Sequence, residues 1–119
     1  MIIAVVGSRR FTSYDTLVDV LAEHVTSLDA LVSGGAAGAD SLARKYAIEY
    51  GLKIVEYLPE WKKYGRAAGP IRNKLIVDDA DVLIAFWDQK SKGTNNSIAL
   101  ARKKGIPTLV YDFQGVKIP

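Results

Sequence analysis

The sequence predicts an α/β fold in which helices cover both faces of a parallel β-sheet. Apolar segments of strand length alternate with segments of helical periodicity along the chain. Two apolar segments, residues 2–6 and 81–86, are almost continuously hydrophobic, which is typical of strands buried on both faces of a parallel sheet. Turns rich in glycine and other small residues follow several of these strands.

Five strands are expected. The two continuous apolar segments are the first and the fourth of them. Shorter apolar runs at residues 30–33, 53–57 and 108–111 supply the others, while residues 112–119 carry little signal of any kind.

The first two helices are expected at residues 14–27 and 40–50. The first follows a Thr12-x-x-Asp15 capping box, and its apolar residues recur on one face as far as Leu28. The second repeats this spacing and stops before Gly51, a residue suited to the position after a helix.

Two more helices are expected nearer the carboxyl end. Pro70 suits the first position of a helix that runs to about Asp79, and the last helix covers residues 95–104. The residues from 58 to 69 form one long loop on the same sheet edge as the glycine turns. Loops of this length in compact domains are often functional.

Strands and helices therefore alternate from one end of the chain to the other. Right-handed crossovers then predict a Rossmann-like open sheet with strand order 3-2-1-4-5 and a ligand crevice between strands 1 and 4. At 119 residues, the sequence fits a single domain, residues 1–119.

Composition limits the possible functions. With 49% hydrophobic and 24% charged residues and no apolar run of about 20, the chain reads as a globular protein without a membrane span. The first residues lack a basic segment and fit a buried strand better than a signal peptide. There is no cysteine, so a cytoplasmic location is the simplest inference. The net charge of +3 suits both phosphate ligands and weak nucleic-acid contact, so it does not decide between them.

The glycine-rich turns are the strongest functional signal. Glycine lets the backbone approach a ligand, and the helix that follows directs free N–H groups and a partial positive charge toward it, which is how proteins hold phosphate. The dinucleotide fingerprint G-x-G-x-x-G and the phosphate loop G-x-x-x-x-G-K-[ST] are both absent, which disfavours NAD binding and ordinary ATP hydrolysis. The predicted ligand-binding residues are Gly7, Ser8, Arg9, Ser33, Gly34, Gly35, Ala36, Gly38, Asp40, Arg72, Asn73, Trp87, Ser91, Gly93 and Thr94.

Several of these residues have a purely structural alternative. Asp40 is as well suited to cap a helix as to bind ribose or water, and Arg72 is either a solvated residue or a clamp for phosphate. Trp61, Tyr64 and Trp87 either pack in the core or stack on a base. His24 is expected on the surface, and no His, Asp or Glu pair has metal spacing, so neither a metal site nor a cofactor is predicted.

Four motifs taken together resemble the SLOG superfamily, and within it the branch of short proteins related to YspA and YpsA. They lie at residues 5–9, 33–40, 64–73 and 85–94, and the resemblance covers about residues 1–111. It implies a Rossmann-like fold, often oligomeric, that binds nucleotides or nucleotide-derived molecules. More distant members are similar to the Lonely Guy phosphoribohydrolases and to the DNA-processing Smf proteins.

The comparison with the phosphoribohydrolases is informative at single positions. Arg72 matches an arginine of that family, and Gly93-Thr94 matches part of its glycine-rich motif. Ser97 stands where those enzymes have a catalytic glutamate, and Phe86-Trp87-Asp88 interrupts the motif. A serine cannot supply the carboxylate that this hydrolysis needs, so the resemblance implies the phosphate site without the catalytic group.

We therefore expect a homo-oligomeric protein that senses a nucleotide-derived small molecule. Phosphate would lie on the N–H groups of residues 34–38 and of Gly93-Thr94, with Arg9 and Arg72 balancing its charge and the base near Trp87 or residues 61–64. One alternative is a nucleotide-processing hydrolase that uses Asp40 or Asp88. The other is binding of single-stranded nucleic acid, which would require a continuous basic groove that the sequence does not indicate.

Overall fold

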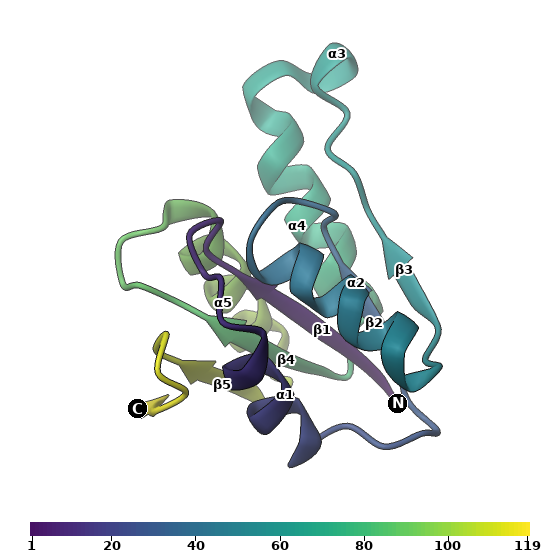
Figure 1. Ribbon diagram of the computed structural model, residues 1–119. Helices are drawn as coiled ribbons and strands as arrows, with labels where there is room; N and C mark the ends of the chain where they lie inside the picture. Colours follow the sequence, from purple (N-terminus) through teal and green to yellow (C-terminus); the bar gives the residue numbers. More distant parts are fainter.

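A computed structural model describes all 119 residues of the chain (Figure 1). Its centre is β1 (Ile2–Gly7), which pairs in parallel with β2 (Ala30–Ser33) on one side and β4 (Val82–Phe86) on the other. The parallel strands β3 (Ile54–Glu56) and β5 (Thr108–Tyr111) lie outside these two. The predicted strand order 3-2-1-4-5 is therefore confirmed. Every carboxyl end of these strands lies on one edge of the sheet.

A sixth strand, β6 (Lys117–Ile118), extends the sheet antiparallel to β5. The turn before it is held by Asp112, whose Oδ1 accepts the N–H groups of Gln114 and Val116 at 2.9 Å each. The sequence analysis missed this strand because two residues are too few to show a periodicity.

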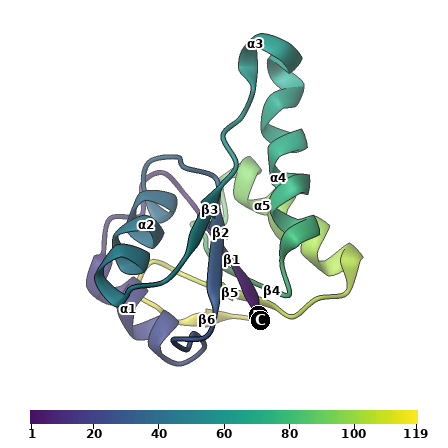
Figure 2. The ribbon, with the colours of Figure 1, turned by 90° about the vertical axis from the view of Figure 1, so that its right-hand side faces the viewer.

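Helices cover both faces of the sheet, as predicted. Figure 2 shows α1 (Tyr14–Ala22) and α2 (Ala39–Tyr50) on one side, and α4 (Ala68–Asp79) and α5 (Lys92–Lys104) on the other. Each side has its own hydrophobic cluster. Phe11 joins the first cluster just after β1, where its ring stacks on Phe86 at a centroid distance of 4.5 Å. None of the helices has the length and apolar character needed to cross a membrane.

The first helix is shorter than predicted. It ends at Ala22, and Leu28, expected on its buried face, is 91% exposed. Its N-cap is Ser13 rather than Thr12, because the Ser13 hydroxyl is the one that accepts the N–H of Thr16. His24 follows the helix and is half-buried, with Nε2 2.8 Å from the hydroxyl of Tyr111.

The segment predicted as a long loop is largely helical. After residue 60 it forms a short helix, α3 (Trp61–Tyr64), and one 3-10 turn, η1 (Gly65–Ala67), and it then continues into α4. Pro70 is therefore the third residue of α4, and α5 begins at Lys92 rather than at residue 95. Figure 1 shows that α3 and the start of α4 project beyond the carboxyl edge of the sheet.

Lys104, at the end of α5, binds the carbonyl groups at the end of α4. Its Nζ donates hydrogen bonds to the carbonyl oxygens of Val77 at 2.9 Å, Asp78 at 2.8 Å and Ala80 at 3.0 Å. We expect Lys104→Met to lower the free energy of unfolding by about 1 to 2 kcal/mol, since the last carbonyls of α4 lose a charged donor. Urea denaturation measures this loss. Lys103→Met on the same turn is the control, and equal midpoints for the two variants would contradict the expectation.

Candidate functional site

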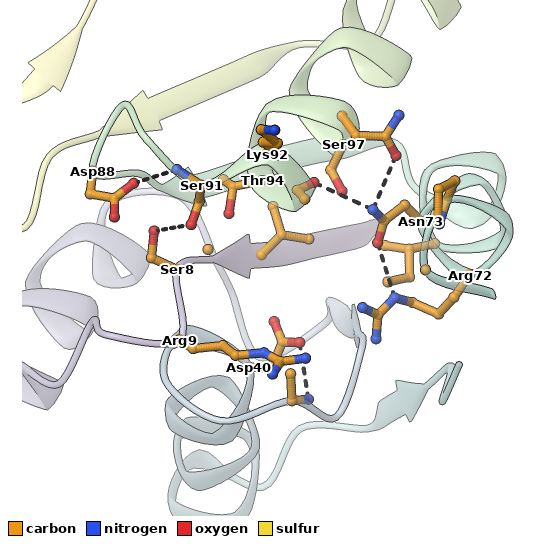
Figure 3. A pocket seen from close by; sticks show the side chains of 18 of the residues that line it. Ser8, Arg9, Asp40, Arg72, Asn73, Asp88, Ser91, Lys92, Thr94 and Ser97 are labelled. Atoms are coloured by element: carbon orange, nitrogen blue, oxygen red, sulfur yellow. Dashed lines mark hydrogen bonds between the residues drawn. The ribbon is translucent and has the colours of Figure 1, made fainter. Parts of the chain in front are cut away.

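A cleft of about 660 Å³ opens at the carboxyl edge of the sheet. Its walls come from the turn after β1, the start of α2, the α3–α4 segment and the start of α5 (Figure 3). This is the predicted location, beside the ends of β1 and β4, where the crossover connections leave in opposite directions. The cleft has a volume in the range of small-molecule sites.

Ten of the fifteen predicted residues line this cleft. They are Gly7, Ser8, Arg9, Ala36, Asp40, Arg72, Asn73, Ser91, Gly93 and Thr94. The other five do not line it: Ser33, Gly34, Gly35, Gly38 and Trp87. The structure thus brings residues from four distant parts of the sequence to one place.

Three of the predicted glycines, Gly7, Gly34 and Gly35, allow a close approach of protein to protein. A Cβ on Gly7 would lie 2.5 Å from the carbonyl oxygen of Phe86, and one on Gly34 would collide with the guanidinium of Arg72. A Cβ on Gly35 would meet Leu58, away from the cleft. These three glycines therefore help to pack the turns that form the cleft, whereas a Cβ on Gly93, which lines the cleft, would meet nothing within 4 Å. Ligand contact by the predicted glycines stays a prediction.

Gly38 shows this packing role most clearly. Its φ of +75° and ψ of −129° lie in a region that side chains disfavour, and a Cβ there would lie 2.5 Å from the carbonyl oxygen of Arg9. Beside it, the N–H of Ala39 donates to the carbonyl oxygen of Ser8 at 3.3 Å. The turns after β1 and β2 are thus joined backbone to backbone.

Arg72 enters the cleft from α4 and is half-buried. Its Nη1 donates to the carbonyl oxygen of Gly34 at 2.8 Å and its Nε to Oδ1 of Asn73 at 3.0 Å, while Nη2 makes no hydrogen bond. Burial lowers the pKa of Arg72 from its usual value and the positive charge of Arg9 lowers it further, whereas Asp40 opposes both effects. Arg72 is therefore an oriented guanidinium and not a freely solvated one.

Asp40 faces Arg72 across the cleft and is 94% buried. Its Oδ2 accepts the N–H of Ala36 at 3.1 Å, so the residue closes the turn before α2 and also lines the cleft. Burial raises the pKa of Asp40 above its usual value, against the lowering effects of the Ala36 N–H and of Arg72. The predicted helix cap is not seen, since the N-cap of α2 is Gly38 and no side chain caps the helix, whereas ribose or water binding by Asp40 stays a prediction.

The turn before α5 is held by Asp88. Its Oδ1 accepts the N–H groups of Lys90 at 2.9 Å and Ser91 at 2.8 Å, and these bonds lower the pKa of Asp88. The indole N–H of Trp87 donates to the carbonyl oxygen of Ser91 at 3.1 Å. Trp87 therefore supports the turn and does not line the cleft, and base stacking on it stays a prediction.

Ser8 and Asn73 connect α5 to the rest of the cleft. The hydroxyls of Ser8 and Ser91 are 2.9 Å apart. Nδ2 of Asn73 donates to the carbonyl oxygen of Gly93 at 3.3 Å and to Oδ1 of Asn96 at 3.1 Å. These contacts fix the start of α5 against β1 and α4.

Sequence reasoning missed several lining residues. Arg10 and Lys92 are the most important because each adds a positive charge. Both could have been found from their places, Arg10 beside Arg9 and Lys92 between two predicted residues. Trp61, Asp88 and Ser97, named above in other roles, also line the cleft, as do Val6, Gly69, Pro70, Ile76 and Asn96.

The cleft has an excess of unpaired positive charge. Arg9, Arg10, Arg72 and Lys92 line it against two carboxylates. The three ion pairs of the structure lie elsewhere, at Met1–Asp29, Arg44–Glu56 and Lys74–Asp78. No group of three or more His, Cys, Asp or Glu side chains could hold a metal ion. The site is thus built to attract anions.

The fold and the position of the cleft define a Rossmann-like protein. A model of the "YspA, cpYpsA-related SLOG family" matches residues 1–64, more than half of the chain, and the protein belongs to this family. The family is one with a nucleotide-related function. A search of curated proteins gave no significant match.

A solved structure, DNA processing protein A (DprA) from Streptococcus pneumoniae, is similar in fold, with a TM-score of 0.72 and 20% sequence identity. The match covers 94% of this chain and 49% of the DprA chain, so the protein spans about half the length of that relative. At this identity the similarity concerns the fold.

Proposed function

We propose that the protein binds a nucleotide or nucleotide-derived ligand in this cleft, in the cytoplasm, as a sensor or regulator. The observation that carries the proposal is the set of four unpaired cations in one cleft at the carboxyl edge of the sheet. Phosphate is the common biological anion that such a site suits, and family membership favours a nucleotide as its carrier.

Binding is tested by isothermal titration calorimetry with AMP, ADP and a short single-stranded oligonucleotide. We expect the mononucleotides to bind with one site per chain. The similarity to a DNA processing protein makes the oligonucleotide the necessary comparison. Binding of the oligonucleotide alone, with a steep dependence on salt, would replace this proposal with nucleic-acid binding.

Trp61 is the best candidate for contact with the base. It lines the cleft, is 53% exposed, and its ring edge lies over Gly69, where a Cβ would be 3.7 Å away. We expect Trp61→Ala to weaken nucleotide binding by about 5- to 150-fold, since stacking on an aromatic side chain contributes about 1–3 kcal/mol per base. Tyr64→Ala, on the same short helix but outside the cleft, is the matched control in the same titration. Equal affinities for both variants would remove Trp61 from the site.

One observation favours an enzyme. Asp40 is a buried carboxyl with a raised pKa in the wall of the cleft, a combination that occurs in general acids. Its Oδ2 is held by Ala36, however, and the position of the family glutamate is Ser97.

We therefore expect little or no release of adenine when the purified protein is incubated with AMP. Chromatography of the reaction mixture measures free base directly. Rapid release that disappears in Asp40→Asn would establish the hydrolase instead.

We also propose a homo-oligomer. Leu58, Trp61, Tyr64 and Leu75 expose between 39% and 65% of their surface on or next to the projecting α3–α4 segment, an arrangement suited to association. Light scattering on the purified protein tests this proposal.

A further inference from the structure

The anion-binding parts of the cleft form two groups on opposite sides of β1. Figure 3 shows Arg9, Asp40 and Arg72 on one side of this strand, and Ser91, Lys92, Thr94 and Ser97 on the other. The first group adjoins the end of β2, because Arg72 binds the carbonyl oxygen of Gly34, and the second begins α5 after β4. Because β2 and β4 flank β1, their ends are about 10 Å apart.

The first group, made by Arg9 and Arg72, has unused donor capacity. Nη2 of Arg72 makes no hydrogen bond, and Arg9 is close enough to lower the pKa of Arg72 by repulsion. Neither guanidinium lies within 4.0 Å of a carboxylate oxygen. An anion between the two arginines would relieve the repulsion and use the free donor.

The second group is the start of α5. The backbone N–H groups of Lys92, Gly93 and Thr94 have no acceptor, and a cation, Lys92, occupies the end of the helix where the macrodipole disfavours it. Independently, the hydroxyls of Thr94 and Ser97 make no hydrogen bond although these residues are only 5% and 2% exposed. Both side chains line the cleft and their hydroxyl oxygens are open to it, so they are available to a ligand there; the buried side-chain oxygen without a partner is instead Oγ of Ser33.

We propose that the natural ligand carries two phosphate groups, one held by Arg9 and Arg72 and the other by the start of α5. This inference rests on the proposed function and specifies the class of nucleotide. The strand ends that the two groups adjoin are about 10 Å apart, a span that suits two linked phosphates better than a single one. Arg9 and Arg72 together face one carboxylate, that of Asp40, while Asp88 lies in the turn before Lys92. A nucleoside diphosphate is the simplest molecule that supplies both anions.

The test compares four probes by calorimetry at fixed pH and ionic strength: inorganic phosphate, pyrophosphate, AMP and ADP. We expect pyrophosphate to bind at least about tenfold more tightly than phosphate, and ADP at least about tenfold more tightly than AMP. In Arg72→Ala and in Lys92→Ala, each of which damages one group, both preferences should fall to about twofold or less.

Lys90→Ala is the matched control. It removes the same charge two residues from Lys92 but lies outside the cleft, so it should keep both preferences. A preference for pyrophosphate and ADP that survives in Arg72→Ala and Lys92→Ala would reflect overall charge and overturn the inference.

The remaining outcomes separate this inference from the proposed function. Equal affinities for AMP and ADP, and for phosphate and pyrophosphate, overturn the two-phosphate site and leave nucleotide binding intact. Pyrophosphate binding that depends on Arg72 and Lys92, without binding of either nucleotide, supports the two-phosphate site and overturns the nucleotide proposal. No binding of any probe overturns both.

Discussion

Replacing Arg72 with alanine is expected to weaken the binding of ADP by roughly 10- to 150-fold, because a hydrogen bond to a charged group contributes about 1.5–3 kcal/mol. The guanidinium is already oriented by Gly34 and Asn73, so little side-chain entropy is lost when its free Nη2 binds an anion. Arg72→Lys should recover only part of the affinity, since an ammonium cannot hold Gly34, Asn73 and a phosphate with one planar group.

Two controls are needed for this comparison. Arg66→Ala removes an exposed cation on the same projecting segment and should leave the affinity unchanged. Thermal unfolding of Arg72→Ala shows whether loss of the bond to Gly34 has disturbed the turn itself. A folded Arg72→Ala protein with the original affinity would assign Arg72 a structural role only.

The sequence predicted the fold well because its signals were local and redundant. The β1 and β4 segments are buried on both faces and therefore continuously apolar, and once strands alternate with helices few topologies remain. Signals failed where an element is short. The four residues of α3 and the two of β6 cannot display a period, and α1 ended at Ala22 although apolar spacing continued to Leu28.

The candidate site was predicted in outline, and its details depend on tertiary contacts. The turns after β1 and β4 were expected to meet, and Ser8 and Ser91 do so. The sequence did not show that Trp87 binds Ser91, because an aromatic residue after a strand can point either toward a ligand or toward the protein. The same holds for the glycines, whose pattern shows that space is needed but not whether a ligand or the protein fills it.

Gly38→Ala is expected to have the largest effect on stability, a loss of about 3 kcal/mol or more in the free energy of unfolding. The backbone at Gly38 has φ +75° and ψ −129°, a conformation that raises the energy of any residue with a Cβ. That Cβ would also collide with the carbonyl groups of Ser8 and Arg9. The chain cannot relieve this without separating the turns after β1 and β2, which form one wall of the cleft. Nucleotide binding should therefore fall together with stability.

Gly51→Ala provides the control because it separates strain from collision. Gly51 also has a positive φ, +69°, but a Cβ there would meet nothing within 4 Å. Gly51 lies at the end of α2 away from the cleft. Gly51→Ala should lower the free energy of unfolding by only about 1 kcal/mol, the usual penalty of the left-handed region, and should leave the nucleotide affinity unchanged. Chemical denaturation of the two variants gives both values. If Gly38→Ala lost no more stability than Gly51→Ala, the close backbone contact between the two turns would not be what shapes the cleft.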